Sequence, residues 1–202
     1  QIAEEFSPIQ GAPAELDLPT PDFNAGTKHV LRDITQSHVC LALPAPSLGD
    51  PQRYTAEVVS SILGGGSTSW LFERIREDEG LAYAIYTFHS FYPRTGLMGV
   101  YAAVAPQNAS RAVELTFDAF RQMRDDGVSE EELELNREQI KGNMLMALES
   151  TFTRMSRMAK CMMYYKRLVP IEEIIANVDA VTTAGIQAYA QQFFLADRCA
   201  LM

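Results

Sequence analysis

The sequence predicts an α+β fold: a mostly antiparallel sheet with helices packed on one face. Three observations predict it. Strand-like runs occur as two pairs, within 28–45 and 83–105. Amphipathic runs of helical length separate the two pairs and follow the second. A short apolar run ends the chain at 199–202. Strands and helices grouped in this way are typical of an antiparallel sheet covered on one side.

Composition limits the class of protein. The chain has 202 residues, of which 47% are hydrophobic and 21% charged, as in an ordinary globular domain. A net charge of −9 argues against a nucleic-acid partner. Cys40, Cys161 and Cys199 are widely spaced, which favours reduced thiols and a cytoplasmic location. No run reaches the roughly 18 apolar residues of a membrane span.

The first 27 residues differ in composition from the rest. Residues 1–7 have the pattern of a helix end, and residues 8–27 are rich in Pro and Gly. Each proline removes a backbone donor and restricts the residue before it. We therefore predict the end of a preceding domain and an interdomain linker over 1–27, and one domain over 28–202. A tail without a preceding domain is the alternative.

Two strands and a helix are predicted next. The strands are expected at 28–34 and 38–45, the second from its alternation of buried-type residues. Asp50 at the N-cap and Pro51 at the first helical position then favour a helix start. This helix is expected to end near Leu63.

The stretch from 63 to 83 is the part around which the chain is organised. It opens with Gly64, Gly65 and Gly66, which permit positive φ angles or close approach of another group. Three candidate N-caps follow: Ser67, Thr68 and Ser69. A phosphate-binding loop would need a Lys-Ser/Thr ending, which this sequence lacks. The glycines therefore indicate a turn or a surface along which an extended peptide passes.

The same stretch continues as a helix, a turn and a strand. Leu71, Phe72 and Ile75 give the helix an apolar face. Gly80 is suited to end it, and the residues from Tyr83 onward favour a strand.

The second half of the chain is predicted to be mainly helical. Residues 83–92 and 96–105 form a hairpin. A helix from Pro106 to about Asp126 is ended by Gly127. The remaining elements are a helix opened by the Ser129–Glu132 capping box, helices at 151–166, from Pro170–Ile171 and from Thr182 or Thr183 to Phe194, and a strand at 199–202.

Two of these helices are rich in methionine, and one of them also carries several basic residues. We expect the methionines to fill the core, with an adaptable binding face as the alternative; they are Met144, Met146, Met155, Met158, Met162 and Met163. The helix at 151–166 also carries Arg154, Arg157, Lys160 and Lys166. A solvated basic face is expected there, with a site for acidic peptides or an acidic partner domain as the alternative.

A family resemblance rests on the central stretch. Leu-Gly-Gly-Gly from Leu63, followed by Arg-Ile-Arg-x-x-x-Gly-Leu-Ala-Tyr ending at Tyr83, resembles the second, non-catalytic domain of the pitrilysin/insulinase (M16) zinc peptidases. The similar branch includes mitochondrial processing peptidase and its bacterial relatives. The resemblance implies the M16 peptidase, or LuxS-like metallohydrolase, domain fold over 28–202. It also implies that Arg76 and Tyr83 face the zinc site of a partner domain and hold the substrate backbone.

No zinc site is predicted within the chain itself. The family motif is His-x-x-Glu-His, with two histidines four residues apart on a helix. Here His29, His38 and His89 stand alone on expected strands. We therefore expect no cofactor in this chain, and the resemblance implies zinc in the partner catalytic domain.

The pair Arg76 and Tyr83 has a chemical rationale. A phenol can stabilise an oxyanion, and a guanidinium can hold a peptide carbonyl or carboxylate. The alternative is that Arg76 pairs with Glu73 or Glu79 while Tyr83 packs at a strand end. With the resemblance, we interpret Arg76 and Tyr83 as auxiliary catalytic and substrate-binding residues, with Gly64–Gly66 as further substrate-binding candidates.

The resemblance also implies a function and partners. This chain would be the non-catalytic half of a zinc metalloendopeptidase, inactive alone, that closes a peptide-binding chamber. Its partners would be a peptide and a domain or subunit bearing His-x-x-Glu-His, in a homodimer or heterodimer when full length. A non-proteolytic scaffold subunit of the same fold is the alternative.

Overall fold

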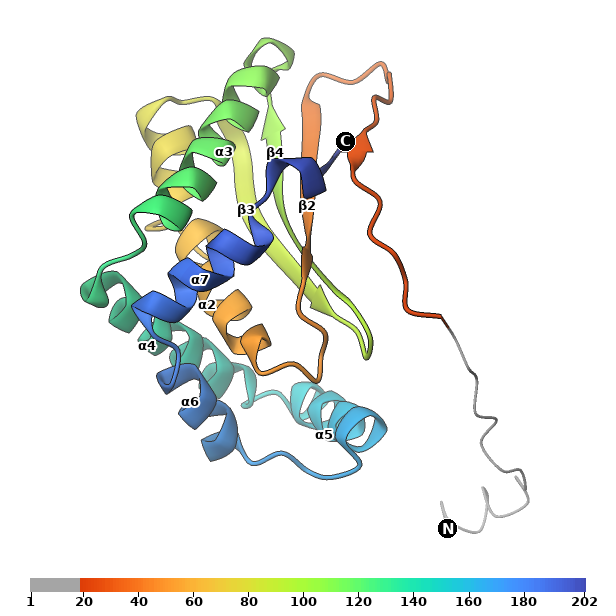
Figure 1. Ribbon diagram of the computed structural model, residues 1–202, viewed down its shortest axis with the longest axis vertical. Helices are drawn as coiled ribbons and strands as arrows, with labels where there is room; N and C mark the ends of the chain where they lie inside the picture. The colour runs from red at the N-terminus through yellow and green to blue at the C-terminus, as the bar shows by residue number, and fades with distance from the viewer. Residues whose placement is uncertain (1–18) are drawn as a thin grey trace.

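The computed structural model describes residues 19–202, which form a five-stranded sheet of order β1-β5-β2-β4-β3 (Figure 1). The predicted helix end at 1–7 and much of the linker lie outside the described residues. The strands are β1 (Gly26–Thr27), β2 (Ser37–Ala45), β3 (Ala82–Phe91), β4 (Gly96–Val104) and β5 (Ala200–Leu201). β1 and β5 pair in parallel, and the other neighbours pair antiparallel.

Helices cover one face of this sheet (Figure 1). The helical elements are α2 (Gln52–Gly64), the π-helix η1 (Phe72–Asp78), the short 3-10 turn η2 (Pro106–Asn108), α3 (Ala109–Asp125), α4 (Glu130–Ala147), α5 (Thr151–Tyr165), α6 (Ile171–Asp179), α7 (Thr183–Phe193) and the 3-10 turn η3 (Ala196–Arg198). The α+β class, the antiparallel character and the one-sided helical layer are confirmed. None of the helices within 19–202 is long and apolar enough to cross a membrane.

Several helix ends follow the sequence signals. The Ser129 hydroxyl accepts from the Glu132 backbone N–H at 3.2 Å, and a Glu132 carboxylate oxygen accepts from the Ser129 N–H at 2.8 Å. The Thr182 hydroxyl accepts from the Gly185 N–H at 3.0 Å. Gly127 ends α3 with a φ of +77°. The capping box, the Thr182 cap and the stop at Gly127 therefore work as predicted.

Two sequence predictions need correction. The strand expected at 28–34 is wrong, because β5 offers a ladder only to Gly26 and Thr27, and the side chain of Leu31 is 97% exposed. The helix α2 begins at Gln52, so Pro51 precedes it instead of occupying its first position. Asp50 still performs a capping role, since its Oδ1 accepts from the Gln52 N–H at 2.8 Å.

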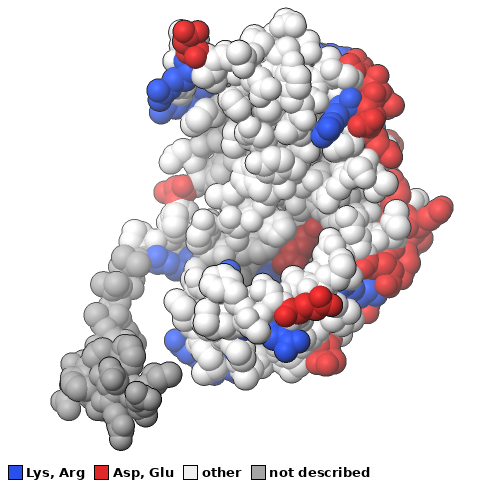
Figure 2. All heavy atoms as spheres, turned by 180° about the vertical axis from the view of Figure 1, so that it is seen from behind, with Lys and Arg blue, Asp and Glu red and all other residues white. Residues whose placement is uncertain are grey.

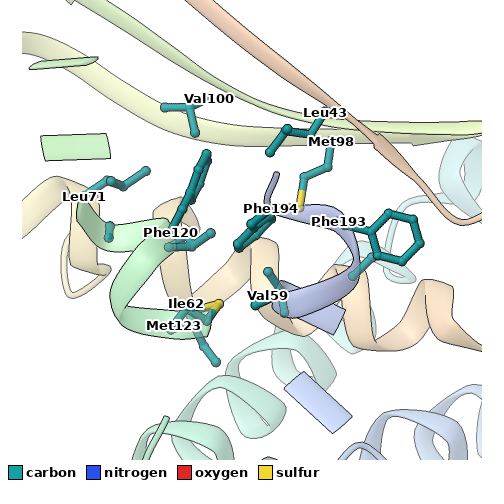
Figure 3. Packing of buried hydrophobic residues seen from close by; sticks show 14 of the residues in the cluster. Leu43, Val59, Ile62, Leu71, Met98, Val100, Phe120, Met123, Phe193 and Phe194 are labelled. Carbon is teal, nitrogen blue, oxygen red and sulfur yellow. The ribbon is translucent and has the colours of Figure 1, made fainter. Parts of the chain in front are cut away.

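The core lies between the sheet and α2, α3 and α7. Inward residues of β2 and β4 meet large side chains from the three helices (Figure 3). The rings of Phe120 and Phe194 stack with centroids 4.4 Å apart, and Tyr189 is fully buried beside Phe193. This packing fixes the sheet as one rigid layer whose opposite face is free of helices within the described residues.

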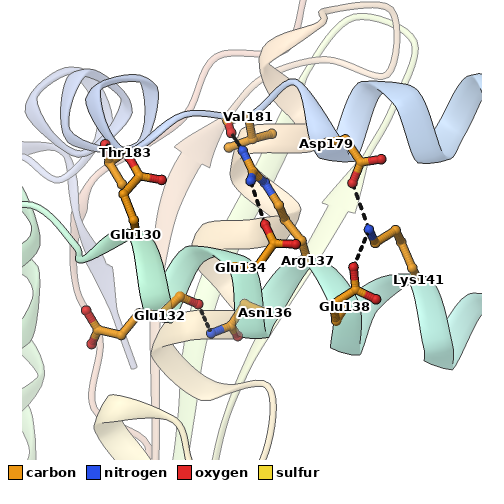
Figure 4. Close-up of polar contacts among 10 residues, drawn as sticks. All are labelled: Glu130, Glu132, Glu134, Asn136, Arg137, Glu138, Lys141, Asp179, Val181 and Thr183. Atoms are coloured by element: carbon orange, nitrogen blue, oxygen red, sulfur yellow. Dashed lines mark hydrogen bonds and ion pairs between the residues drawn. The ribbon is translucent and has the colours of Figure 1, made fainter.

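Polar contacts hold α4 against α6 and the residues that follow it. Lys141 bridges Glu138 at 2.6 Å and Asp179 at 2.8 Å, and Arg137 donates to the Val181 carbonyl (Figure 4).

The expectation that the methionines fill the core is wrong for five of the six, since they are largely exposed: Met146, Met155, Met158, Met162 and Met163. Their helices place them on a side that no described element covers.

Candidate functional site

The glycine run lies at the end of α2, where this helix packs closely against strand β3. Gly64 is the last residue of α2, and a Cβ there would lie 2.6 Å from the Thr87 backbone nitrogen. A Cβ on Gly65 would lie 2.7 Å from Ser61 Cα. None of the three has a positive φ, so close approach is the reason for glycine at Gly64 and Gly65. A role for Gly64–Gly66 in binding substrate stays a prediction.

The segment after the glycines is a π-helix, which the sequence pattern did not predict. The Ser69 hydroxyl donates to the Gly66 carbonyl at 2.6 Å, so it does not cap the helix that follows. Leu71 and Ile75 are fully buried, as their apolar spacing indicated. Gly80, with a φ of +60°, ends the element. Single π-turns inside helices are frequent at functional sites, which draws attention to this helix.

Arg76 projects outward from this π-helix. Its guanidinium lies 4.7 Å from the centre of the Phe72 ring, and its Nε is 3.9 Å from Glu77 Oε1. The side chain is 44% exposed. Of the two alternative partners of Arg76, Glu79 pairs with Arg111 at 3.0 Å instead, and no ion pair found among the described residues joins Arg76 to Glu73. Stacking on Phe72 limits the rotamers of Arg76 while leaving donors free for a ligand.

Tyr83 occupies a β-bulge at the edge of the sheet. Ala82 pairs with Val104 and Ala84 with Ala103, so Tyr83 is the extra residue between two consecutive pairs. Bulges redirect a side chain and are common at sheet edges and beside active sites. The Tyr83 side chain is 61% exposed, so it is not packed at the strand end as the alternative required. Among the described contacts, no hydrogen bond joins it to Arg76.

Three aromatic side chains, one from each of β2, β4 and β3, lie together on the sheet. Tyr86 and Tyr101 face each other on β3 and β4 with ring centres 5.0 Å apart. The Tyr101 hydroxyl and His38 Nδ1 form a hydrogen bond of 2.6 Å. We call His38, Tyr101 and Tyr86 the aromatic row. Sequence reasoning missed it, because it depends on the register between three strands; alternation on β3 and β4 was the available signal.

The π-helix also carries acidic side chains beside Arg76. A hollow of about 560 Å³ adjoins it and is lined by Glu73, Glu77 and Asp78 together with Ser67 and Phe72. The exposed edge near Arg76 therefore combines one cation with three carboxylates. This mixed charge suits contacts with a polar peptide backbone better than contacts with a single charged ligand.

The chain does not present a zinc site within residues 19–202. No group of three His, Cys, Asp or Glu side chains in this range could hold a metal ion. His38 bonds to Tyr101, and His89 lies at the other end of the sheet, where burial lowers its pKa. The described residues therefore offer no set of ligands that fits zinc.

Comparisons with known proteins agree with this geometry. The family profile described as "Peptidase M16 inactive domain" matches residues 1–140. The chain belongs to the peptidase M16 family, as its inactive domain. It is 31% identical over 180 residues to the uncharacterized zinc protease YmxG of Bacillus subtilis, covering 89% of this chain and 44% of that protein. An uncharacterized zinc protease of Mycobacterium tuberculosis is 32% identical over 162 residues, covering 80% of this chain and 37% of its own length.

Solved structures share the M16 fold. The peptidase M16 inactive domain from Pseudomonas fluorescens superposes with a TM-score of 0.76 at 19% identity, covering 88% of this chain and 42% of that one. A protease from Helicobacter pylori gives a TM-score of 0.84 at 16% identity, covering 98% and 50%. This chain spans half or less of the length of each of these four proteins. The two sequence relatives, from Bacillus subtilis and Mycobacterium tuberculosis, are both named as zinc proteases.

Proposed function

We propose that this domain forms one wall of a peptide-binding chamber whose catalytic groups belong to a partner domain, and that Arg76 and Tyr83 contact the bound peptide. The observation that carries the proposal is the exposed side chain of Tyr83 at a β-bulge. Tyr83 follows the turn after the π-helix of Arg76 and lies at the edge of the sheet. The family membership supports it, because an inactive domain implies a catalytic one.

Tyr83 is proposed as a hydrogen-bond donor to the reacting carbonyl of the peptide. A phenol is neutral at pH 7 and donates one hydrogen bond, which strengthens as negative charge develops on the carbonyl oxygen. The bulge fixes the backbone of Tyr83 through its neighbours Ala82 and Ala84, each paired to β4. A donor on a rigid strand needs little reorganisation during the reaction.

Arg76 is proposed to hold the peptide backbone. Its guanidinium carries five N–H donors in a fixed plane, and the ring of Phe72 supports that plane at 4.7 Å. Phe72 in turn packs against the core. Arg76 would bind the peptide equally in the ground and transition states, so it contributes to affinity more than to turnover.

The partner is proposed to be a domain bearing the His-x-x-Glu-His motif, in the same polypeptide or in a second subunit. It would hold the zinc, which supplies Lewis-acid chemistry when bound. Support comes from the zinc protease relatives, of which this chain matches less than half the length. A homodimer or heterodimer of the full-length protein would then enclose the chamber.

The test uses the full-length protein and a synthetic unfolded peptide. Tyr83→Phe is expected to lower kcat, by up to on the order of 10²–10³ for the loss of one oxyanion donor. Arg76→Ala is expected mainly to raise KM. Neither should change the melting temperature much, because both side chains are exposed.

Two matched controls lie in or next to the same elements. Arg74 lies on the same π-helix but bonds to Gln122 Oε1 at 2.7 Å, and Tyr92 follows β3 at its far end. Arg74→Ala and Tyr92→Phe should leave kcat and KM near their original values. Normal kinetics in both Arg76→Ala and Tyr83→Phe would remove these residues from the mechanism. Absence of any cleavage by the intact protein would favour the scaffold function.

A further inference from the structure

A cavity of about 600 Å³ lies away from Arg76 and Tyr83, between α5, the start of α2 and the end of β3. Its walls include Tyr54, Phe91, Tyr165, Val169 and Ile174. Figure 2 shows a hollow with recessed acidic and basic atoms below a largely uncharged central area, with further charged atoms toward the edges of the face. Volumes of this size hold ligands of drug size, and predominantly apolar walls with a few polar groups are typical of binding sites.

The cavity is the place where cations gather in an acidic chain. Arg53, Arg157 and Lys160 line it, whereas the whole chain has a net charge of −9. No ion pair found among the described residues involves any of the three. Arg53 donates to the Tyr54 hydroxyl at 2.5 Å and to Leu48 and Tyr165. Cations that line an apolar cavity and form none of the ion pairs found among the described residues are available to an anionic ligand.

The anchoring of the arginines fixes their position. Arg53 lies over the Tyr54 ring, 4.4 Å from its centre, and 5.3 Å from that of Tyr165. Arg157 donates to the Val169 carbonyl, which uses one of its five N–H groups. Both guanidinium groups are therefore held in place with donors to spare. Binding at preorganised groups costs less conformational entropy than binding at free surface side chains.

One carboxyl group, that of Glu57, also lines the cavity, one helical turn after Arg53 on α2. Burial raises the pKa of Glu57 to about 7, although Arg53 acts in the opposite direction. At neutral pH this carboxyl is therefore protonated in a large fraction of molecules. A protonated carboxyl can donate a hydrogen bond to an acceptor that the arginines already attract.

The set of groups discriminates between classes of ligand. A cationic ligand would meet three positive side chains and only a partly ionised Glu57. A small hydrophilic anion would leave the aromatic and aliphatic walls without a partner. An apolar group with one carboxylate satisfies the walls, the cations and Glu57 together.

We propose that this cavity binds an apolar ligand that carries a carboxylate, held between Arg53, Arg157 and Lys160 at its polar end. The carboxyl end of a peptide with an apolar last residue and a free aliphatic acid share this chemistry. The inference goes beyond the proposed function, which does not require the cavity.

The experiment measures binding to the full chain by isothermal titration calorimetry, with three probes. They are acetyl-Ala-Ala-Phe with a free carboxylate, the same peptide as its C-terminal amide, and decanoate. The acid peptide is expected to bind at one site, and its amide at least about tenfold more weakly, because a charge-assisted hydrogen bond is lost. Decanoate that competes with the acid peptide would extend the site to free aliphatic acids. Decanoate that binds when the peptide does not would assign the site to free acids.

Variants of the cavity cations test whether the ligand binds at this site. Arg157→Gln combined with Lys160→Gln should weaken binding of the acid by about tenfold or more. Circular dichroism shows whether loss of the Arg157–Val169 hydrogen bond disturbs folding. If it does, Lys160→Gln alone replaces the double variant in the binding experiment. Arg121→Gln, on α3 and outside the cavity lining, is the matched control.

Three results would overturn the proposal: equal binding of acid and amide, unchanged binding by the double variant, or no binding of either acid. None of these measurements involves peptide cleavage. Failure of this site therefore leaves the kinetic test of Arg76 and Tyr83 unaffected, and the reverse also holds.

Discussion

The two ends of this domain contain the same kind of amphipathic helix in different surroundings. Over the sheet, α2, α3 and α7 bury their apolar sides, and Ile62 is only 1% exposed. At the other end, α5 leaves Phe152 70% exposed and Met163 64% exposed. Both regions have helical apolar periodicity. Periodicity therefore determines the helix, whereas burial depends on whether another element lies over its apolar side.

The contacts that hold α5 in place are also different in kind. They are polar: Arg53 donates to the Tyr165 hydroxyl, Arg154 to the Leu148 carbonyl and Arg157 to the Val169 carbonyl. The core helices instead are held by interdigitated apolar side chains (Figure 3). Local stability follows buried apolar contact, so the α5 end should open before the core.

The largest expected effect compares one residue from each region. Ile62→Ala should lower the free energy of unfolding by about 2–5 kcal/mol, because it leaves a cavity in a packed core. Met163→Ala should change it by less than about 0.5 kcal/mol, because its side chain is already in solvent. Chemical denaturation with unchanged m-values measures both. A large loss in Met163→Ala would contradict the contrast between the regions.

The second prediction concerns Glu57, at the boundary between the two regions. Its pKa is about 7 in the folded protein and ordinarily 4.5, so the folded state binds the proton more tightly. The contribution to stability is therefore full below pH 4.5 and is lost as pH rises to about 7, by at most ~3 kcal/mol. Glu57→Gln, which stays uncharged, should be more stable than the original at pH 8 and similar at pH 4.5.

Denaturant unfolding at pH 4.5, 6 and 8 tests the Glu57 prediction. Glu114, with a side chain 64% exposed, provides the control, and Glu114→Gln should run parallel to the original protein across this range. If the free energy of unfolding of Glu57→Gln also ran parallel to that of the original protein from pH 4.5 to 8, the Glu57 carboxyl would not control stability in this pH range.

Local signals in the sequence predicted most of the fold. The capping box at Ser129, the stop at Gly127 and the strand alternation around Leu41 involve neighbours within a few residues. The strand at 28–34 was wrong for the opposite reason. Strand formation there depends on a ladder partner distant in sequence, and β5 supplies one only to Gly26 and Thr27.

The candidate site also contains residues that the sequence identified and features that it could not. The family resemblance of the central stretch singled out Arg76 and Tyr83, and the structure leaves both side chains exposed. The sequence could not predict the bulge at Tyr83 or the aromatic row, because both depend on the register of β3 with β4. The cavity was missed as well, since its walls come from residues more than 100 positions apart, such as Arg53 and Tyr165.

The smallest expected effect compares two glycines, one from each region. In Gly64→Ala the new methyl would lie 2.6 Å from the Thr87 backbone nitrogen, so strand β3 and helix α2 would have to separate. We expect a loss of about 1–3 kcal/mol. Gly142 lies inside α4 with nothing within 4 Å of its added Cβ. Gly142→Ala should therefore stabilise the protein by about 0.5–1 kcal/mol, because alanine loses less backbone entropy on folding. Thermal and denaturant unfolding measure both changes, and effects of the same sign would show that the close packing of α2 on β3 does not require glycine.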